Sequence, residues 1–444
     1  MKVILILGAG RSSSSLISYL LKEAERNNWK VLVGDHSEAA ARLRLGNSRC
    51  GAAFTFDVHN KQESTSIIEG VDLVISLLPP HLHILAAELC VELGKHFFTA
   101  SYVSAEMRSL DAKVKAKNLL FLNECGLDPG IDHMSAMRVI DKIRASRETL
   151  VSFESFTGGL IAPETDPQNP WRYKFTWNSR NVVLAGQSTA KFLKNGKHKY
   201  ISYQQLFKST TPVHISEYGE YEGYANRDSL SYINTYGIEG IKTMLRGTLR
   251  SKGFCDAWNI FVQLGCCDDS YWMDDVDRMT HLDFIQTFIT NESGKNIEER
   301  LANQLGVLPH GPALEKLRWS GFFDTIPIGL TKGTPAQILE HILAKKWKLN
   351  RTDKDLIIMY HRFIYSSHGK QKEIQSSLRV TGDDAVNTAM AKTVGLPLAI
   401  ATKLLMQGKI KQRGVIIPIN SELYEPILDE LKMLGIEIEE KEIN

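Results

Sequence analysis

The feature that most constrains the fold is an apolar run near the start of the chain that leads directly into a glycine turn. Val3 to Leu7 is continuously apolar, as expected for a parallel strand buried on both faces. Gly8-Ala9-Gly10 follows, and Leu16 to Leu21 then has helical apolar spacing. Gly8 permits a tight turn, and Gly10 lets a pyrophosphate approach amides at the helix N-terminus. This order predicts a dinucleotide-binding unit, although a Gly-x-Gly pair alone is a weak signal.

The turn continues through Arg11 into the serines Ser12 to Ser15. Ser13 stands where a dinucleotide fingerprint usually has its third glycine, and its small side chain is compatible with close packing of helix on strand. The serine hydroxyl groups could also donate to phosphate. We therefore include Arg11, Ser12 and Ser13 among the cofactor-binding positions.

An acidic residue ends the second predicted strand, which begins at Trp29. Asp35 is placed to accept hydrogen bonds from a ribose 2′-hydroxyl and would repel a 2′-phosphate, so it favours NAD over NADP. The alternative for Asp35 is a surface turn residue. His36 argues weakly the other way, because a cation there would favour a phosphate, and NADP is left open.

Apolar runs and helical patterns alternate over the first 122 residues. Repeated units of this length predict an α/β fold with a Rossmann-type, doubly wound parallel sheet. Helices are expected near 64–68, 84–93 and 111–117. The expected strands after the second are Ala52–Val58, Leu73–Leu78, Phe97–Thr99 and Leu119–Leu122.

Ligands of such sheets lie beyond the carboxyl ends of the strands. The turns 76–83, 99–102 and 124–133 should share that rim, with Ser76 and Leu77 among the cofactor contacts. The third turn combines carboxylates, a proline, glycines and a histidine ahead of a helix expected over Met134 to Ile140. It could equally be an ordinary strand-to-helix turn in which Asp132 caps the helix.

The character of the sequence changes after residue 140. Val151 to Phe156 alternates like a half-buried strand, and the stretch 158–178 looks irregular. We expect an inserted α+β substrate and dimerisation domain over 131–380, and a nucleotide domain of 1–130 completed by about 381–444. Further elements are expected at 212–216, 298–305, 336–349, 356–360, 388–406, 415–418 and 422–434.

Bulk composition excludes several classes of protein. A net charge of +2 over 444 residues gives no reason to expect nucleic acid or an anionic membrane as a partner. No apolar run approaches the roughly 20 residues of a membrane helix, and Val3 to Leu7 does not lead to a signal cleavage site. The six cysteines form no CxxC pair and no metal-like spacing with histidines. A cytoplasmic protein without a metal is expected.

Several ordered motifs resemble saccharopine dehydrogenase of the glutamate-forming type, also called saccharopine reductase. Together they cover nearly the whole chain. The matching stretches are Val74–Pro79, Thr99–Ser104, Gly126–His133, Gly158–Leu160, Ala162–Glu164, Tyr173–Phe175, Trp177, Asn226–Ser229, Leu245–Arg250 and Ala389–Lys392.

The resemblance implies NAD(P)+-dependent oxidation of saccharopine, with hydrolysis to glutamate and 2-aminoadipate 6-semialdehyde. A homodimer is expected for such two-domain dehydrogenases. Positions matching saccharopine contacts are Ser101, Tyr102, Asp128, Arg227, Gly247, Thr248 and Leu249. Positions matching cofactor contacts are the Gly8–Ser13 loop, Asp35, Asp57, Val58, Ser101, Leu127, Asp128, Pro129, Gly130 and Trp177.

The chain also departs from the family pattern. Pro80 stands where a tyrosine is frequent, although His83 keeps its place. Thr157 replaces a frequent cysteine, so a thiol role does not carry over. Fungal relatives that use NADP have a sequence similar to Cys-Arg-Thr at the position where this chain has Asp35-His36-Ser37. This difference argues against NADP and agrees with the preference for NAD inferred from Asp35.

The chemistry of saccharopine fits these side chains. Its three carboxylates need cations or amides, which Arg227, Gly247 and Thr248 could supply. For Arg227 the alternative is a structural ion pair near Asp228. Asp128 is the expected catalytic residue, because the secondary amine must lose a proton before hydride can leave. His83 and His133 are candidate proton relays, although a lone histidine is more often structural.

Two other functions remain open from the sequence. A dehydrogenase of another secondary amine, such as carboxynorspermidine, would need fewer carboxylate partners than Arg227 and Gly247 to Leu249 provide. A dinucleotide-binding protein without activity would not need Asp128. An assay with saccharopine separates these alternatives.

Overall fold

The computed structural model describes residues 1–443. The chain forms two compact units. The first contains residues 1–147 and 382–439, and the second contains residues 148–381 and the end of the chain from 440. The expected domain boundary at 130/131 therefore precedes helix α7 (Ile131–Ala145), whereas the units divide after it.

The first unit is built on a seven-stranded sheet in the order β15-β6-β5-β4-β1-β2-β3, in which the paired strands run parallel. β1 pairs with both β2 and β4, so the strand order reverses at β1, and the carboxyl end of β1 is the switch point where such sheets bind ligands. The strands are β1 (Lys2–Leu7), β2 (Trp29–Asp35), β3 (Gly51–Thr55), β4 (Leu73–Ser76), β5 (His96–Thr99), β6 (Leu120–Leu122) and β15 (Gly414–Ile416).

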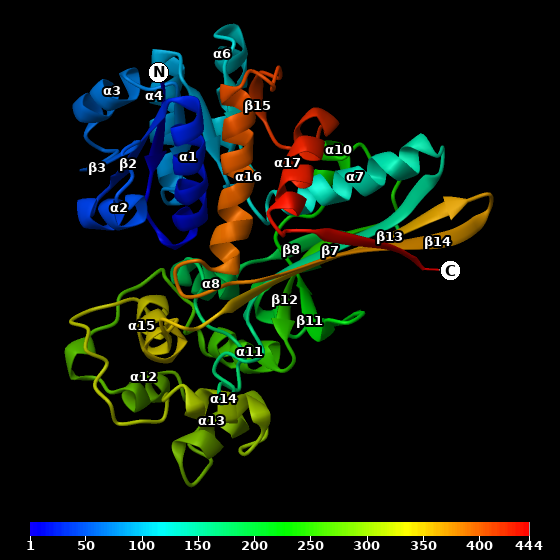
Figure 1. Ribbon diagram of the computed structural model, residues 1–444. Helices are drawn as coiled ribbons and strands as arrows, with labels where there is room; N and C mark the ends of the chain where they lie inside the picture. Colours follow the sequence, from blue (N-terminus) through cyan, green and yellow to red (C-terminus); the bar gives the residue numbers. More distant parts are fainter. Residues whose placement is uncertain (444) are drawn as a thin grey trace. The chain divides into compact units, whose positions relative to one another are not determined.

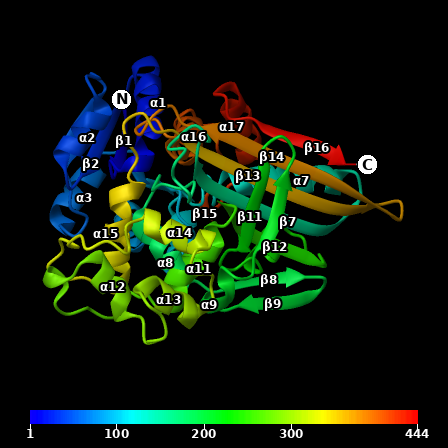
Figure 2. The same ribbon diagram turned by 90° about the horizontal axis from the view of Figure 1, so that it is seen from below.

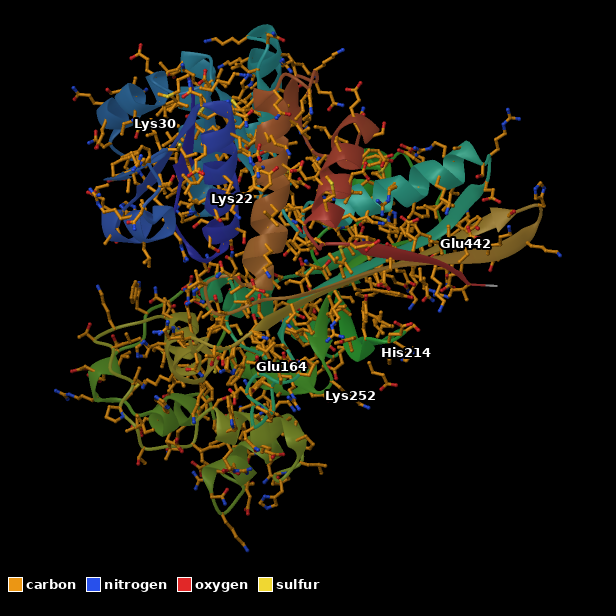
Figure 3. All side chains as sticks on the ribbon, viewed as in Figure 1. Lys22, Lys30, Glu164, His214, Lys252 and Glu442 are labelled. Carbon is orange, nitrogen blue, oxygen red and sulfur yellow. The ribbon has the colours of Figure 1, made fainter. Side chains whose placement is uncertain are left out.

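Helices cover this sheet, and α1 runs beside α16 (Figure 1). A Cβ on Gly395 of α16 would lie 2.9 Å from the amide nitrogen of Leu16, so the glycine lets the two helices approach closely. Lys22 of α1, labelled in Figure 3, is exposed. The helices are η1 (Arg11–Ser13), α1 (Ser14–Asn27), α2 (Glu38–Leu45), α3 (Lys61–Glu69), η2 (Pro80–Leu82), α4 (His83–Leu93), α5 (Ala105–Ser109), α6 (Asp111–Ala116), α7, α16 (Ala389–Met406) and α17 (Ser421–Met433).

The sequence led us to expect no apolar segment near the length of a membrane helix, but helix α16 approaches that length. Its 18 residues are long and apolar enough to cross a membrane, but 83% of this stretch is buried inside the protein. Burial of that extent is typical of a core helix.

The second unit contains a mixed sheet in which β7 pairs with β12 in parallel and with β13 in antiparallel orientation. The sheet order is β10-β11-β12-β7-β13-β14-β16, and β8 joins it by pairing with β12 and β9 (Figure 2). The strands are β7 (Thr149–Ile161), β8 (Ala190–Lys194), β9 (Lys197–Ile201), β10 (Thr211–Ile215), β11 (Gly219–Ala225), β12 (Thr243–Ser251), β13 (Asp355–Ser367), β14 (Lys370–Thr381) and β16 (Ile438–Ile443).

An aromatic core holds the helices of this unit together. Trp171, Trp258 and Trp347 are almost fully buried, and the Trp171 and Trp347 ring centroids lie 5.1 Å apart. The helices are α8 (Ser179–Leu184), η3 (Ala185–Gln187), α9 (Tyr203–Leu206), α10 (Ser231–Thr235), α11 (Phe254–Leu264), η4 (Val276–Arg278), α12 (His281–Thr287), α13 (Ile297–Leu305), α14 (Pro312–Trp319) and α15 (Pro335–Trp347).

The expected elements are present, with differences at their ends. The strand expected over 52–58 ends at Thr55, and β7 continues to Ile161, into the stretch expected to be irregular. Helix α7 begins at Ile131 with Gly130 as its N-cap, so the alternative of Asp132 as the cap is wrong. The sequence interpretation missed several elements, most of them in the second unit. They are α2, α5, α8, α9, α10, α11, α12, α14, β8, β9, β11, β12, β14 and β16.

Candidate functional site

The glycine turn after β1 has the geometry expected of a phosphate-binding turn. Gly8 has φ +106°, and a Cβ there would lie 3.0 Å from the carbonyl oxygen of Leu77, so this position needs glycine. Gly10 has an ordinary φ of −68°. A Cβ on Gly10 would meet no atom of residues 1–443 within 4 Å. The protein's own packing thus leaves open space in front of Gly10, which fits the close approach of a pyrophosphate.

The side chains that follow this turn are partly used inside the protein. The Ser13 hydroxyl is fully buried and donates to the Gly10 carbonyl oxygen at 2.8 Å, while Ser14 donates to Val386. The Ser13 amide also donates to the Gly10 carbonyl, at 3.3 Å, so Ser13 closes the turn. Ser12 is half-buried and Arg11 is exposed.

Asp35 at the end of β2 is tied to the glycine turn. One carboxylate oxygen accepts from the Ala9 amide at 2.7 Å, and the other accepts from the Ser37 amide at 2.9 Å. His36 is exposed beside it. This fixes the carboxylate next to the turn, where a ribose would lie.

The sequence interpretation missed Arg44 on α2. Its Nε donates to the carbonyl of Ala9 at 3.4 Å and its Nη2 donates to that of Gly10 at 3.3 Å. Burial lowers the pKa of this guanidinium from its ordinary value. A cation thus lies on the same turn as the Asp35 carboxylate.

The predicted cofactor positions Asp57 and Val58 follow the end of β3. Asp57 accepts a hydrogen bond from the His59 amide at 2.9 Å, and Val58 is buried.

A buried hydroxyl and imidazole network follows β4 and β5. His83 Nδ1 lies 2.8 Å from the Ser76 hydroxyl, and Nε2 lies 2.7 Å from the Ser101 hydroxyl and 3.4 Å from that of Thr99. Burial, with a smaller contribution from His81, lowers the pKa of His83 to about 4. The ring is therefore neutral at pH 7 and orients Ser101 rather than carrying a charge.

The loop after β5 and the loop after β6 are bonded to each other. The Tyr102 hydroxyl donates to Asp128 Oδ1 at 3.1 Å, the Glu124 amide donates to Ser101 at 3.1 Å, and the Val103 amide donates to Glu124 at 3.0 Å. Asp128 is half-buried, whereas Leu127, Pro129 and Gly130 around it are buried. The Asp128–Pro129 peptide bond is cis. Asp128 is thus the accessible carboxylate of this loop.

The turn between Gly126 and Gly130 brings the backbone into contact with itself. A Cβ on Gly130, which has φ +150°, would lie 2.1 Å from the Gly126 carbonyl oxygen. Burial raises the pKa of the neighbouring Cys125 thiol above its ordinary value, which keeps it protonated. The short distance from a Gly130 Cβ to the Gly126 carbonyl oxygen means that no side chain fits where the two glycines meet.

His133 and Asp132 serve this turn from inside. His133 is fully buried with Nε2 2.8 Å from Glu124, and Asp132 accepts from the Gly130 amide at 2.6 Å. These contacts give both residues a role in shaping the loop that presents Asp128.

In the second unit, Arg227 lies just after β11 with φ +48°, and its carbonyl accepts from the Lys191 amide at 2.8 Å. The neighbouring Asp228 carboxylate pairs with Lys191 Nζ at 2.8 Å and accepts from the amides of Leu230 and Ser231. The structural partner that the sequence suggested for Arg227 is thus engaged with Lys191.

Strand β12 carries the other predicted carboxylate-binding positions. A Cβ on Gly247 would lie 2.6 Å from both the Phe156 ring and the Tyr224 carbonyl oxygen, so glycine is required. Thr248 pairs with Tyr224 of β11 in the sheet, and Leu249 is fully buried. Arg250 is buried with its guanidinium over the Tyr173 ring at 5.1 Å, as a structural cation would be.

Thr157 lies opposite Thr248 in the pairing of β7 with β12. Its buried hydroxyl oxygen makes no hydrogen bond with any residue that the structure describes, which marks it as a candidate ligand contact. Trp177 is half-buried after the segment that Lys174 anchors through ion pairs to Asp353 at 2.7 Å and Asp166 at 3.0 Å.

The predicted residues thus fall into two groups, one in each unit. The structure brings the predicted cofactor positions of the first unit to one edge of its sheet, together with His83, Ser101, Tyr102 and Asp128. The second unit holds Trp177, Arg227, Gly247, Thr248 and Leu249.

Comparison with known proteins finds two family models that cover most of the chain. The model for the saccharopine dehydrogenase NADP binding domain matches residues 4–122. The model for the saccharopine dehydrogenase C-terminal domain matches residues 126–436.

Individual relatives agree with these models. The chain is 32% identical to saccharopine dehydrogenase [NADP(+), L-glutamate-forming] of Schizosaccharomyces pombe, over 100% of both chains. It is 34% identical to the mitochondrial alpha-aminoadipic semialdehyde synthase of Bos taurus, where 98% of the chain spans 47% of that protein. The chain thus spans about half the length of such mammalian relatives.

Solved structures show the same fold. Apo saccharopine dehydrogenase (L-Glu forming) from Saccharomyces cerevisiae superposes with a TM-score of 0.89 at 29% identity, with 100% of both chains covered. Homospermidine synthase from Legionella pneumophila, at 10% identity and a TM-score of 0.56, shares the fold alone.

Proposed function

The chain belongs to the saccharopine dehydrogenase family, and from this premise we propose that it oxidises saccharopine with a nicotinamide cofactor. The products are L-glutamate and 2-aminoadipate 6-semialdehyde, and the reverse reaction makes saccharopine. The observation that carries the proposal is the accessible Asp128 carboxylate, held by Tyr102 on a rim that also carries the open glycine turn.

The protein's part in the reaction begins with proton transfer. The secondary amine of saccharopine must lose a proton to make its lone pair available, and Asp128 is the side chain we assign to the nitrogen. A nicotinamide cofactor held at the Gly8–Gly10 turn would supply the hydride acceptor for the adjacent carbon. Tyr102 orients Asp128 by its hydrogen bond, and His83 orients Ser101.

Water completes the reaction. It adds to the imine carbon, and the carbinolamine collapses with proton transfer to the nitrogen that leaves as glutamate. Positioned acid–base groups usually contribute about 10² to 10⁴ in rate to such steps. We assign the binding of substrate carboxylates to the Arg227 guanidinium and to the amides and hydroxyl group of Gly247, Thr248 and Leu249.

We propose NAD+ as the preferred cofactor, with NADP+ as the alternative. Support for NAD+ comes from the Asp35 carboxylate, which is fixed at the turn by the Ala9 and Ser37 amides. Support for NADP+ comes from Arg44 on the same turn and from the names of the fungal relatives. We favour NAD+ because the negative carboxylate of Asp35 would repel the 2′-phosphate of NADP+.

We further propose a cytoplasmic location and a homodimeric state. The six cysteines are all free, which supports a reducing compartment. Sedimentation of the purified protein would test the dimer.

The test of the function is an assay with the purified chain, NAD+ and saccharopine, in which reduction of the nicotinamide and release of glutamate are both measured. Equal amounts of the two products support the proposal. Reduction with carboxynorspermidine but not with saccharopine would indicate a dehydrogenase of another secondary amine. Cofactor binding without reduction would indicate a protein that has lost activity.

A further inference from the structure

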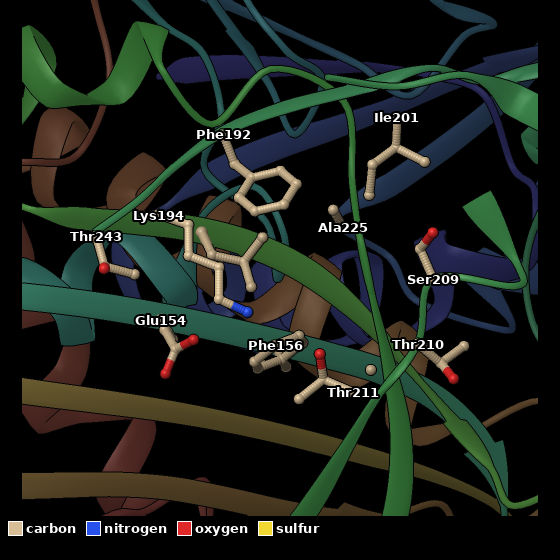
Figure 4. A pocket seen from close by; sticks show the side chains of 12 residues that line it. Glu154, Phe156, Phe192, Lys194, Ile201, Ser209, Thr210, Thr211, Ala225 and Thr243 are labelled. Atoms are coloured by element: carbon tan, nitrogen blue, oxygen red, sulfur yellow. The ribbon is translucent and has the colours of Figure 1, made fainter. Parts of the chain in front are cut away.

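The second unit contains a cavity of about 270 Å³ that the proposed reaction does not use. It lies between the β8–β9 hairpin, the segment before β10, and strands β7, β11 and β12 (Figure 4). Successive residues of a strand face opposite sides of a sheet. Glu154 and Phe156, which line the cavity, therefore face away from Thr157, which alternates with them on β7.

The lining is divided by chemistry. Figure 4 shows Glu154, Lys194 and Thr243 on one side of the cavity and Ser209, Thr210 and Thr211 on the other. The remaining side chains of the lining are apolar. They are Phe156, Phe192, Ile201, Ala225 and Leu245.

The charged side carries one cation and one anion. Within residues 1–443, no hydrogen bond or ion pair involves the Lys194 ammonium group. Glu154 has a long contact of 3.4 Å with Arg362, and Arg362 makes its shorter contact, 2.8 Å, with Glu373. Glu154 therefore keeps capacity to accept hydrogen bonds from a ligand.

The frame around these charges is rigid. The Thr243 hydroxyl accepts from the Asn195 amide at 3.1 Å, which ties the turn of the hairpin to the start of β12. Met244 of β12 pairs with Leu193 of β8 in the sheet. Lys194 is thus presented from a fixed backbone, although its side chain is exposed.

From this arrangement we propose that the cavity binds a free α-amino acid as its zwitterion. The carboxylate pairs with Lys194, the ammonium group pairs with Glu154, and the methylene groups of the side chain pack on the apolar residues. The three hydroxyl groups opposite receive a polar side-chain end. The volume falls just below the range of about 300–1,000 Å³ for drug-sized ligands, which favours a molecule of amino-acid size.

Calorimetric titration of the full chain tests this site. The probes are L-lysine, L-glutamate and L-leucine. Two half ligands serve as controls: acetate carries only a carboxylate, and n-butylamine carries only an ammonium group. At least one amino acid should bind with a Kd of about 1 mM or tighter. Each half ligand should bind at least about tenfold more weakly, since it meets one charged partner instead of two.

Variants locate the binding. Lys194→Ala should weaken it about tenfold, and Glu154→Gln should do the same. Lys197→Ala, on the same hairpin but outside the lining, should leave it unchanged. Lys194 and Lys197 are both exposed, so neither variant should alter the melting temperature.

Two results would overturn the proposal. The first is the absence of binding by all three amino acids. The second is binding that Lys194→Ala leaves unchanged but Arg227→Ala abolishes, which would move the ligand to the substrate positions. L-Glutamate is also a product of the proposed reaction, so the comparison of Lys194→Ala with Arg227→Ala distinguishes this cavity from the substrate positions.

Discussion

The Tyr102 hydroxyl donates to Asp128 Oδ1 across 3.1 Å, and this bond joins the loop after β5 to the loop after β6. Two further bonds join the same loops: the Glu124 amide donates to the Ser101 carbonyl, and the Val103 amide donates to the Glu124 carboxylate. The half-buried Asp128 is therefore held in place by its neighbours before any ligand arrives. Such preorganisation is what the proton transfer that we propose for Asp128 requires.

We expect Tyr102→Phe to lower kcat about tenfold, because it removes a hydrogen bond to a charged acceptor but keeps the aromatic ring. Stability should change by no more than about 1 kcal/mol. Steady-state kinetics with a melting curve tests this. An unchanged kcat would show that the tyrosine hydroxyl does not contribute to the orientation of Asp128.

Gly10→Ala should raise the KM for the cofactor at least about tenfold without loss of stability. The φ of −68° suits alanine, and the added Cβ meets no described atom within 4 Å, so the methyl group would occupy only the space left for the ligand. Gly70→Ala is the matched control, because its Cβ would have an ordinary contact of 3.6 Å with Ile67. Equal cofactor KM values in the two variants would refute the phosphate-binding role of the turn.

The Asp35 carboxylate should set the cofactor preference. We expect kcat/KM to be higher with NAD+ than with NADP+, and Asp35→Asn to reduce that ratio about tenfold by removing the negative charge. The asparagine oxygen can still accept from the Ala9 amide, so the turn should persist. Glu69→Gln, an exposed acid at the end of α3, is the control. A native preference for NADP+ would contradict the argument and point to Arg44.

His83 should make the protein less stable in mild acid. Its pKa is about 4 when folded, below the ordinary 6.5, so the unfolded chain binds more protons between these values. The stabilisation is complete above about pH 6.5 and is lost as pH falls toward 4, by up to about 3 kcal/mol. The measurement is urea unfolding across this range for the native chain and His83→Asn.

The variant should lack this part of the pH dependence and should be less stable at pH 7, because the Ser76 and Ser101 hydroxyl groups lose their shared partner. His214→Asn, at an exposed position on β10 (Figure 3), is the control. Parallel curves for the native chain and His83→Asn would mean that His83 titrates normally.

The fold of the first unit and part of the candidate site could be predicted from local sequence patterns. The buried strands of the first unit are continuous apolar runs, and the rule that ligands lie beyond their carboxyl ends brought Ser76, Ser101 and Asp128 to one rim before the structure was known. The family motifs added Arg227 and Gly247, whose surroundings depend on strands distant in sequence.

What could not be predicted depends on tertiary contacts. Arg44 reaches the glycine turn only because α2 packs beside it, and the apolar spacing of α2 contains no sign of that contact. The two hydroxyl partners of His83 come from different strands. Asp132 looked like a helix cap, but the helix begins two residues earlier than such a cap requires, with Gly130 as its N-cap.

The most direct test of the account is the initial rate of NAD+ reduction with saccharopine, measured for the native chain and for Asp128→Ala, with Glu92→Ala as an exposed carboxylate control on α4. We predict reduction with an equal amount of glutamate for the native chain and the control. For Asp128→Ala we predict a rate at least about 10²-fold lower at an unchanged melting temperature. A native chain that does not reduce NAD+ or NADP+, or a folded Asp128→Ala variant with the native rate, would contradict it.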